Sequence, residues 1–357
     1  MPRARGADLM RSVLVTGGSG YFGSILAGLA LERGDNVRVF DLNAPSGDEV
    51  GGPAGARVEF VAGDVRDRSA ITAACEGVDV VLHNVAQVPL AKDRALFQSV
   101  NVTGTANVLL AARDQRVAKV VHTSSSAIFG IPETNPVTEE TPGRPLEAYG
   151  RAKLEAEQLC RDAAESGLDV TIVRPRTILG HGRLGIMAVL FEFVAEGAPV
   201  YVLGRGDNTY QFVHANDLAD ACLRAADREK PTVYNIGATT FGTMRATLQA
   251  LVDHAGTGSR VRSLPAGPAR AAMRAAAGLG IAPFAPYHWL LYSESLWFDT
   301  TKAQTELHWE ARHTNASAVI ESYEWFLAHR ATLRDHAGSH HQSPVRLGLL
   351  ELLKRLP

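Results

Sequence analysis

The sequence predicts an α/β fold, a doubly wound parallel sheet followed by a smaller C-terminal lobe. Short valine-rich runs alternate with amphipathic stretches through the first half of the chain, and this alternation is typical of βαβ units. The alternation loosens after Pro175. At 357 residues the chain is also long for one hydrophobic core, so a second lobe is expected.

Six short apolar runs are the predicted strands of the sheet, and they cover residues 12–16, 37–40, 58–61, 80–83, 119–124 and 170–174. The amphipathic stretches between them predict helices over residues 21–33, 68–76, 95–113 and 148–165. Beyond Pro175 we expect one strand over 233–236 and helices over 186–196, 216–226, 300–307 and 316–329. Residues 266–297 are rich in alanine, proline and aromatic side chains and predict no single element.

The composition limits the partners and the compartment. Net charge is −2 and no basic block stands out, so we expect no nucleic-acid partner. The three cysteines are far apart and the 12 histidines form no H-E-x-x-H pattern, so no metal site is expected. The N-terminus lacks the apolar core of a signal peptide, and no run approaches the length of a membrane span. A cytoplasmic protein is expected.

A glycine triplet follows the first predicted strand and opens the first predicted helix. Gly17, Gly20 and Gly23 are spaced three residues apart. The first glycine allows a tight turn, the second lets the backbone approach a pyrophosphate, and the third lets the helix pack on the strand. The start of the helix then offers free N–H groups and a positive dipole end to the phosphates. The pattern predicts a dinucleotide site.

Asp41 ends the second predicted strand, 24 positions after Gly17 (41 − 17). A carboxylate at this place accepts hydrogen bonds from the adenosine ribose and repels a 2′-phosphate. We therefore expect NAD rather than NADP as the cofactor. The alternative is an ordinary loop aspartate after a strand.

Tyr149 and Lys153 lie four residues apart at the start of a predicted helix, which puts both side chains on one face. A nearby ammonium lowers the pKa of tyrosine toward the working pH, so Tyr149 can act as general base in alcohol oxidation and as general acid in ketone reduction. Ser125 stands at the end of the fifth predicted strand, and ligands bind at that edge of such sheets. These residues predict hydride transfer at a secondary alcohol carbon.

In this order the motifs resemble those of the extended short-chain dehydrogenases/reductases, the NAD-dependent epimerase/dehydratase family, over about residues 12–330. This group has a Rossmann domain and includes nucleotide-sugar 4-epimerases and 3β-hydroxysteroid dehydrogenases. The resemblance implies catalysis by Ser125, Tyr149 and Lys153. It implies cofactor contacts by Gly17, Gly20, Tyr21, Phe22, Gly23, Asp41, Asn43, Asp64, Val65, Val85, Ala86, Asn101, Ser124, Tyr149, Lys153 and Pro175. The implied substrate contacts are Gln87, Ser126, Arg176, Thr177 and Tyr210.

We expect four parts in the chain. These are an N-terminal tail over residues 1–11, an NAD-binding Rossmann domain over 12–175, a substrate-binding lobe over 176–330 whose residues 205–240 return to the Rossmann domain, and a C-terminal tail over 331–357 with an amphipathic helix. That leucine-rich helix can touch a membrane surface, although such tails more often pack on protein. The resemblance also implies a homodimer, paired through the helices predicted over 95–113 and 148–165.

The resemblance narrows the chemistry. The 4,6-dehydratases carry an Asp–Glu pair where this chain has Ser126 and Ala127, so the acid and base for loss of water are missing. The C3/C5 epimerases carry a cysteine at the position of Ala127. Two reactions remain open: 4-epimerisation of a nucleotide sugar through a keto intermediate, and a single oxidation as in 3β-hydroxysteroid dehydrogenases. A non-catalytic NAD-binding regulator is disfavoured because both Tyr149 and Lys153 are present.

The substrate is less clearly indicated than the chemistry. Nucleotide-sugar enzymes usually carry an asparagine at the position of Thr177 and an arginine at the position of Tyr210, and arginines grip diphosphates as bidentate forks. Arg176, Arg183 and Arg205 are the candidates to replace such a fork. The run over residues 202–214 favours a sugar substrate, whereas the aromatic-rich run over 283–298 favours an apolar or lipid-linked one. An epimerase of nucleotide sugars is the first expectation.

Overall fold

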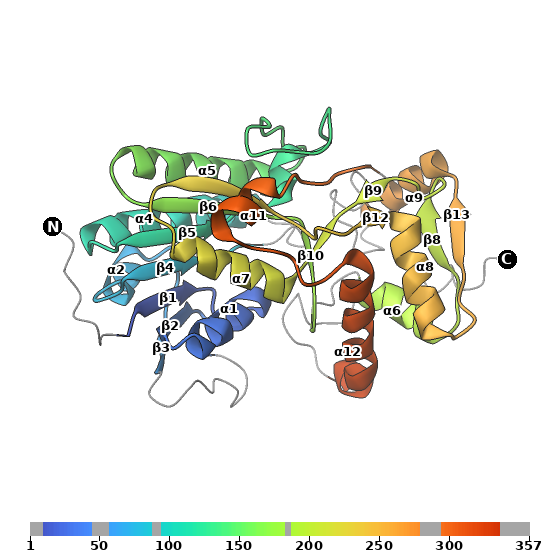
Figure 1. Ribbon diagram of the computed structural model, residues 1–357, viewed down its shortest axis with the longest axis horizontal. Helices are drawn as coiled ribbons and strands as arrows, with labels where there is room; N and C mark the ends of the chain where they lie inside the picture. The colour runs from blue at the N-terminus through green and yellow to red at the C-terminus, as the bar shows by residue number, and fades with distance from the viewer. Residues whose placement is uncertain (1–9, 45–56, 88–93, 183–186, 279–293, 336–357) are drawn as a thin grey trace.

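The computed structural model describes residues 10–44, 57–87, 94–182, 187–278 and 294–335 (Figure 1). Its centre is a seven-stranded sheet in the order β11-β6-β5-β4-β1-β2-β3, in which all neighbours pair in parallel. The strands are β1 (Ser12–Thr16), β2 (Asn36–Asp41), β3 (Val58–Ala62), β4 (Val80–His83), β5 (Lys119–Thr123), β6 (Val170–Pro175) and β11 (Thr232–Ile236). The predicted doubly wound sheet is confirmed, with every predicted strand within one residue of its expected bounds.

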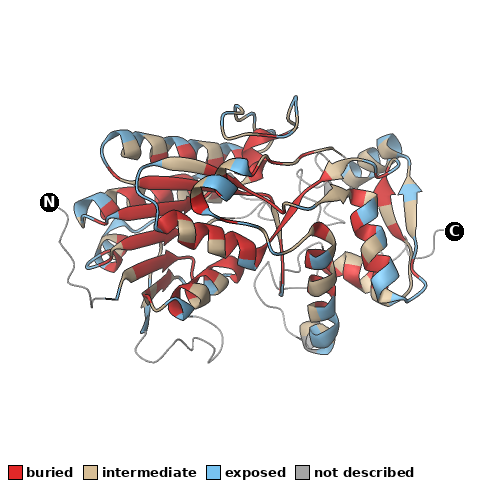
Figure 2. Ribbon diagram, viewed as in Figure 1, coloured by how far each residue is buried: buried red, intermediate tan, exposed pale blue. Residues whose placement is uncertain are grey.

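Helices cover both faces of this sheet. They are α1 (Tyr21–Glu32), α7 (Ala215–Ala226) and α11 (Thr301–Leu307) on one face, and α2 (Arg68–Ala74), α4 (Gly104–Asp114) and α5 (Ala148–Glu165) on the other. Successive residues of β1 divide between the two cores: Val13 and Val15 pack with α1, and Leu14 packs with α4. Because side chains alternate along a strand, a sheet covered on both sides is apolar along most of its strands. Figure 2 shows the central strands buried, including β4, β5 and β6, whereas the edge strand β3 is largely exposed.

The stretch predicted as one helix over 95–113 is divided in the structure. A short turn, α3 (Arg94–Leu96), leads into a wider π-helical turn, η1 (Phe97–Thr103), before α4 begins. The π turn takes in one more residue than an α turn, and such turns are frequent at functional sites. Apolar periodicity does not distinguish the two turns, so the prediction was wrong in this detail.

The smaller lobe lies beside the large sheet (Figure 1) and has its own hydrophobic core. Its helices are α6 (Met187–Ala195), α8 (Met244–Ala255), α9 (Ala266–Gly278) and α12 (Asn315–Asp335). Its strands pair in twos: β7 (Thr177–Leu179) with β10 (Phe212–His214), β8 (Val200–Leu203) with β13 (Val261–Leu264), and β9 (Thr209–Tyr210) with β12 (Gly242–Thr243). Helix α9 corrects the expectation of no single element over 266–297. The aromatic-rich run lies mostly outside the described residues, as do Arg183 and the tail beyond Asp335.

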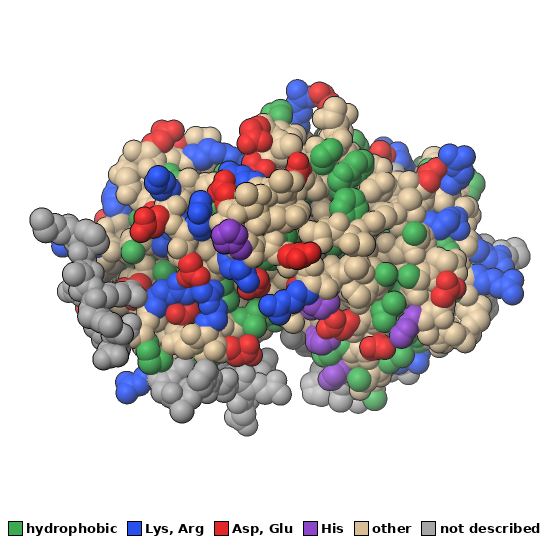
Figure 3. Space-filling view, viewed as in Figure 1, with side chains coloured by type: hydrophobic (Ala, Val, Ile, Leu, Met, Phe, Trp, Pro, Cys, Tyr) green, Lys and Arg blue, Asp and Glu red, His purple; other side chains and the backbone are tan. Residues whose placement is uncertain are grey.

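Two later segments join the first half of the chain. Strand β11 pairs with β6 at the edge of the large sheet, and α7 shares a core with α1. No helix in the described parts of the chain combines the length and the apolar character needed to cross a bilayer. On the face drawn in Figure 3, acidic and basic side chains are interspersed. The predicted domain bounds at residues 175 and 330 stay predictions.

Candidate active site

The glycine loop between β1 and α1 is shaped by close backbone contacts. Gly17 has φ +72°, and a Cβ there would lie 2.8 Å from Val85 Cα. A Cβ on Gly23 would lie 2.0 Å from the carbonyl oxygen of Gly17. Gly20 is the N-cap of α1 and has no side chain to cap the first-turn N–H groups. These groups are therefore left for a ligand, as a pyrophosphate site requires.

Asp41 lies at the end of β2, beside this loop. One of its carboxylate oxygens accepts a hydrogen bond from Ser19 N at 3.1 Å, and the other accepts from Asn43 N at 3.3 Å. The carboxylate is thereby fixed next to the start of α1, where the ribose of a dinucleotide is expected. The loop and the carboxylate together fit NAD.

Asp64 and Val65, the residues expected near the adenine, follow the end of β3. Arg66 N donates to Asp64 Oδ1 at 2.9 Å, and the side chain of Arg66 also binds this carboxylate. The hydrogen bond from the Arg66 side chain holds the pKa of Asp64 below its usual range. The side chain of Val65 is buried against Gly104, where a Cβ would lie 2.7 Å from Val65 Cγ1. Asp64 is thus a charged acceptor, while Val65 is part of the core.

Asn101, on the π turn, holds the segment after β4. Its Oδ1 accepts from Gln87 N at 2.7 Å and its Nδ2 donates to Gln87 O at 3.0 Å. Its amide is therefore already used. The hydroxyl of Ser124 donates to Glu157, and the ring of Phe22 packs in the core. Each of these three side chains therefore already has partners within the protein.

The predicted catalytic residues come from β5 and α5. Ser125 directly follows β5, and its Oγ accepts a hydrogen bond from Ala127 N at 3.2 Å in the short 3₁₀ turn η2 (Ser126–Phe129). Tyr149 is the second residue of α5 and packs in one cluster with Ala127 and Phe97. A Cβ on Gly150 would lie 2.5 Å from the carbonyl oxygen of Ala127. Only glycine at this position lets the start of α5 approach the serine segment so closely.

Lys153 lies one turn further along α5, and only 2% of it is exposed. Its ammonium donates to the carbonyl oxygen of Thr123 at 2.8 Å. Burial lowers the pKa of Lys153 to about 8, although the charge of Glu157 acts in the opposite direction. This hydrogen bond fixes the lysine of α5 at the last residue of β5, at the carboxyl edge of the sheet.

Glu157 is a residue of this site that the sequence reasoning missed. It is fully buried and accepts hydrogen bonds from Ser124 Oγ at 2.6 Å, Arg174 Nε at 2.9 Å and Arg174 Nη2 at 2.7 Å. It thereby joins α5 to the ends of β5 and β6. Its position four residues after Lys153, on the same helix face, was the available signal.

The expected substrate residues follow β4, β5 and β6 or lie on the smaller lobe. Thr177 Oγ1 and the hydroxyl of Tyr210 are 2.8 Å apart, and Ser126 is buried at the start of η2. Arg176 is fully buried, whereas the side chain of Arg205 is 89% exposed and paired with Asp207. The structure therefore separates these two arginines, of which only Arg176 lies in the interior.

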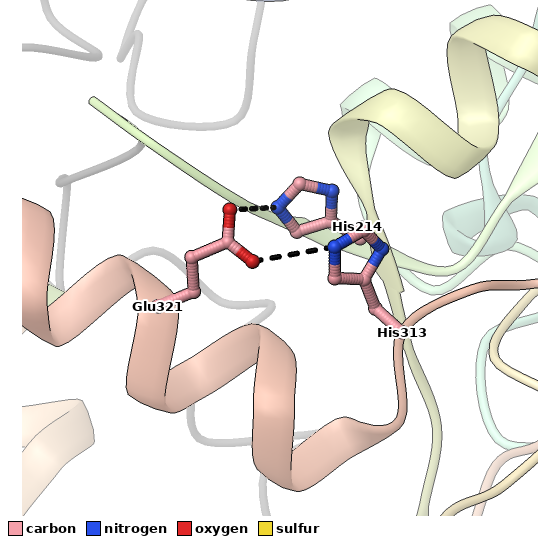
Figure 4. A group of neighbouring side chains, drawn as sticks. All are labelled: His214, His313 and Glu321. Atoms are coloured by element: carbon pink, nitrogen blue, oxygen red, sulfur yellow. Dashed lines mark ion pairs between the residues drawn. The ribbon is translucent and has the colours of Figure 1, made fainter.

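A second polar cluster lies where the end of β10 meets α12 (Figure 4). His214, His313 and Glu321 present ligand atoms that all lie within 4.8 Å of one another. Glu321 Oε1 is 3.6 Å from His214 Nε2, and Oε2 is 3.2 Å from His313 Nε2. The other nitrogen of His313, Nδ1, is 3.0 Å from Asp217 Oδ2.

The side chains of this cluster are bound to one another and to neighbouring groups, as in a polar junction. His214 Nδ1 accepts from Asn216 N at 3.2 Å, and burial lowers the pKa of His214 to about 3, so the ring is neutral and its one proton is on Nε2. In this tautomer the N–H of Nε2 faces the carboxylate of Glu321. The rings of His214 and His313 also stack with their centres 3.8 Å apart at 22°.

The chain was compared with known proteins. It matches the NAD dependent epimerase/dehydratase family over residues 13–237. It is 49% identical to the uncharacterized protein y4nG of Sinorhizobium fredii, over 97% of this chain and 86% of that protein. It is 27% identical to the probable UDP-arabinose 4-epimerase 3 of Arabidopsis thaliana, over 91% of this chain and 83% of that protein. The crystal structure of the Thermus thermophilus UDP-glucose 4-epimerase with NAD has a TM-score of 0.70 and 27% identity, over 88% of this chain and 99% of that one.

The family match covers the glycine loop, the serine segment and the start of α5. It confirms the resemblance predicted from the motifs, and the expectation of NAD as cofactor is confirmed with it. The chain belongs to the NAD dependent epimerase/dehydratase family and is an NAD-dependent enzyme.

Proposed function

We propose that this enzyme is a nucleotide-sugar 4-epimerase, which inverts a secondary alcohol carbon through a keto intermediate. The observation that carries the proposal is the packing of Tyr149 with Ala127, two residues after Ser125, on the helix whose Lys153 binds the carbonyl oxygen of Thr123. Ser126 and Ala127 follow the serine. Loss of water from a sugar needs a further acid and base beside the serine. Reversible oxidation of an alcohol needs only one proton-transfer group, and Tyr149 supplies it.

Each of the three residues has one role in the proposed reaction. Tyr149, as phenolate, takes the proton from the sugar hydroxyl and later returns it to the keto oxygen. Lys153 favours this phenolate by its positive charge. Ser125 holds the reacting oxygen by a hydrogen bond. Bound NAD supplies the hydride acceptor and donor, and return of the hydride to the opposite face of the sugar inverts the carbon without net redox change.

The nucleotide-sugar substrate is supported by the relatives. The similar 4-epimerases are named for UDP-arabinose and for UDP-glucose. We therefore expect a UDP-linked sugar here as well. The test is incubation of the NAD-saturated enzyme with UDP-glucose, UDP-arabinose and a panel of hydroxysteroids, with product stereochemistry read by NMR and reduced cofactor read by its absorbance.

Inverted sugar without accumulation of reduced cofactor is the expected outcome. Reduced cofactor in proportion to oxidised hydroxysteroid would identify a dehydrogenase instead. Tyr149→Phe should lower kcat by at least about 100-fold, because it removes the proton-transfer group, and should leave NAD affinity unchanged. Undiminished turnover in this variant would contradict the proposed site.

We also propose that the enzyme acts as a homodimer in the cytoplasm, paired through α4 and α5. The support is the family resemblance, in which the matching helices form the dimer interface. Light scattering on the purified protein should give twice the chain mass of 38.2 kDa. A single-chain mass across the accessible concentration range would contradict the dimer.

A further inference from the structure

The guanidinium of Arg176 is buried, and no described residue forms a hydrogen bond or ion pair with it. Only 1% of the residue is exposed, and Nε, Nη1 and Nη2 are all buried without a hydrogen-bond partner among the described residues. Arg174, two positions earlier, is equally buried, but it is bound by both carboxylate oxygens of Glu157. An unpaired charge in the interior is strongly unfavourable. Arg174 has a carboxylate partner and Arg176 has none in the described parts of the chain, so a negatively charged ligand would stabilise Arg176.

Two aromatic rings flank the Arg176 guanidinium. Its Cζ lies 4.8 Å from the ring centre of Tyr210 and 5.5 Å from that of Phe298. Cation–π contacts of this kind stabilise the charge and hold the group in place. They do not supply the oxygen acceptors that the five N–H donors require. The group is thus held in position with its hydrogen-bonding capacity unused, as a bidentate oxyanion site needs.

The position of Arg176 in the fold is at the substrate side of the site. It follows Pro175, the last residue of β6, at the carboxyl edge where ligands bind in open parallel sheets. Phe298 packs on Phe129 with ring centres 5.6 Å apart, and Phe129 ends the turn that begins directly after Ser125. Tyr210 belongs to the smaller lobe. Arg176 therefore lies between the serine segment and the smaller lobe.

We propose that Arg176 binds an oxyanion carried by the substrate, and thereby selects acidic substrates over neutral ones. The oxyanion is either the diphosphate of the nucleotide or a carboxylate on the sugar ring, since both present two oxygens to a planar guanidinium. This inference rests on the proposed function, because it takes the substrate to be a nucleotide sugar. The inference assigns the anion-binding role to Arg176, whereas Arg174 is already paired with Glu157.

The test measures binding rather than turnover. Calorimetric titrations of the NAD-saturated protein use UDP, UDP-glucose and UDP-glucuronic acid, with wild type, Arg176→Met, Arg176→Lys and Arg205→Met. Methionine keeps much of the length of the side chain and removes the charge and the donors. Arg205 is the matched control, because it belongs to the same lobe but is exposed and paired with Asp207.

The expected result is a loss of affinity on the order of 100-fold in Arg176→Met, the size seen when one partner of a buried charge pair is removed. Arg176→Lys should lose less, and Arg205→Met should bind as wild type does. An equal loss for all three ligands identifies the diphosphate as the oxyanion. A loss confined to UDP-glucuronic acid identifies a sugar carboxylate.

Thermal melting distinguishes lost binding from lost folding. Without ligand, Arg176→Met should melt at or above the wild-type temperature, because an unpaired buried charge is gone. Wild-type affinity for all three ligands in Arg176→Met would overturn the inference, as would failure of the wild type to bind any of them. If the wild type binds through Arg176 but epimerises none of the sugars, the proposed function fails and the inference stands. If the wild type epimerises a sugar and Arg176→Met binds it with unchanged affinity, the inference fails and the proposed function stands.

Discussion

Replacing Glu157 with glutamine removes one buried negative charge beneath the proposed catalytic residues and keeps nearly the same volume. In the native protein this carboxylate binds Ser124 and both Nε and Nη2 of Arg174 at 2.6–2.9 Å. Glu157 is fully buried and Arg174 is only 3% exposed. Breaking a buried charge pair by removing one partner costs about 3–5 kcal/mol. Glutamine keeps part of the hydrogen bonding, so we expect about 3 kcal/mol of lost stability.

The same substitution should change the pH dependence of turnover. Burial lowers the pKa of Lys153 to about 8, and Glu157 counteracts part of this effect. Without the carboxylate the pKa of Lys153 falls further. Since the charged ammonium favours the phenolate of Tyr149, activity is lost as pH rises through the pKa of Lys153. The alkaline limb of the kcat/KM profile should therefore move to lower pH in Glu157→Gln.

Two measurements check this reasoning, urea unfolding and the pH profile of kcat/KM. Glu155→Gln is the matched control, because Glu155 lies on the same helix but is exposed and accepts only from Gln98 among the described residues. The control should change the free energy of unfolding by less than about 0.5 kcal/mol. The reasoning is refuted if Glu157→Gln unfolds like Glu155→Gln and its alkaline limb stays in place.

Three further predictions concern the cofactor loop and acid stability. Gly23→Ala should abolish NAD binding, measured by calorimetry, because its Cβ would lie 2.0 Å from Gly17 O. Gly28→Ala, in open space on the same helix, should bind NAD normally and gain up to about 1 kcal/mol. Asp41→Asn should narrow the preference for NAD over NADP in kcat/KM, and a wild-type preference for NADP would contradict the assigned role. Burial and the charge of Lys153 lower the pKa of His83 to about 3, so the unfolded chain takes up its proton first and stability falls as pH drops from about 6.5 toward 3. Protonation of His83 accounts for up to about 5 kcal/mol of this loss in the free energy of unfolding. Urea unfolding of His83→Asn should therefore show a smaller loss of stability between these pH values.

Several features of this protein were determined by the sequence alone. The strands of the large sheet are mostly apolar, and the helices between them are amphipathic, so local pattern was enough to find them. The glycine loop, Asp41 and the Tyr149–Lys153 pair are also local, since each depends on a spacing along the chain. These signals led to the family and to NAD. The catalytic roles of Ser125, Tyr149 and Lys153 stay predictions.

The tertiary structure decided what depends on distant partners. Strands β9 and β12 are two residues long, and only their pairing, Tyr210 with Gly242 at one end, defines them. Glu157 and Arg174 are ordinary charged residues in the sequence, and the packing of α5 on β6 made them a buried pair. The sequence does not distinguish Arg176 from Arg205. In the structure Arg176 lies between the rings of Tyr210 and Phe298, and Arg205 is exposed to solvent. The burial and charge pairing of these side chains arise from contacts between elements that are distant in the sequence.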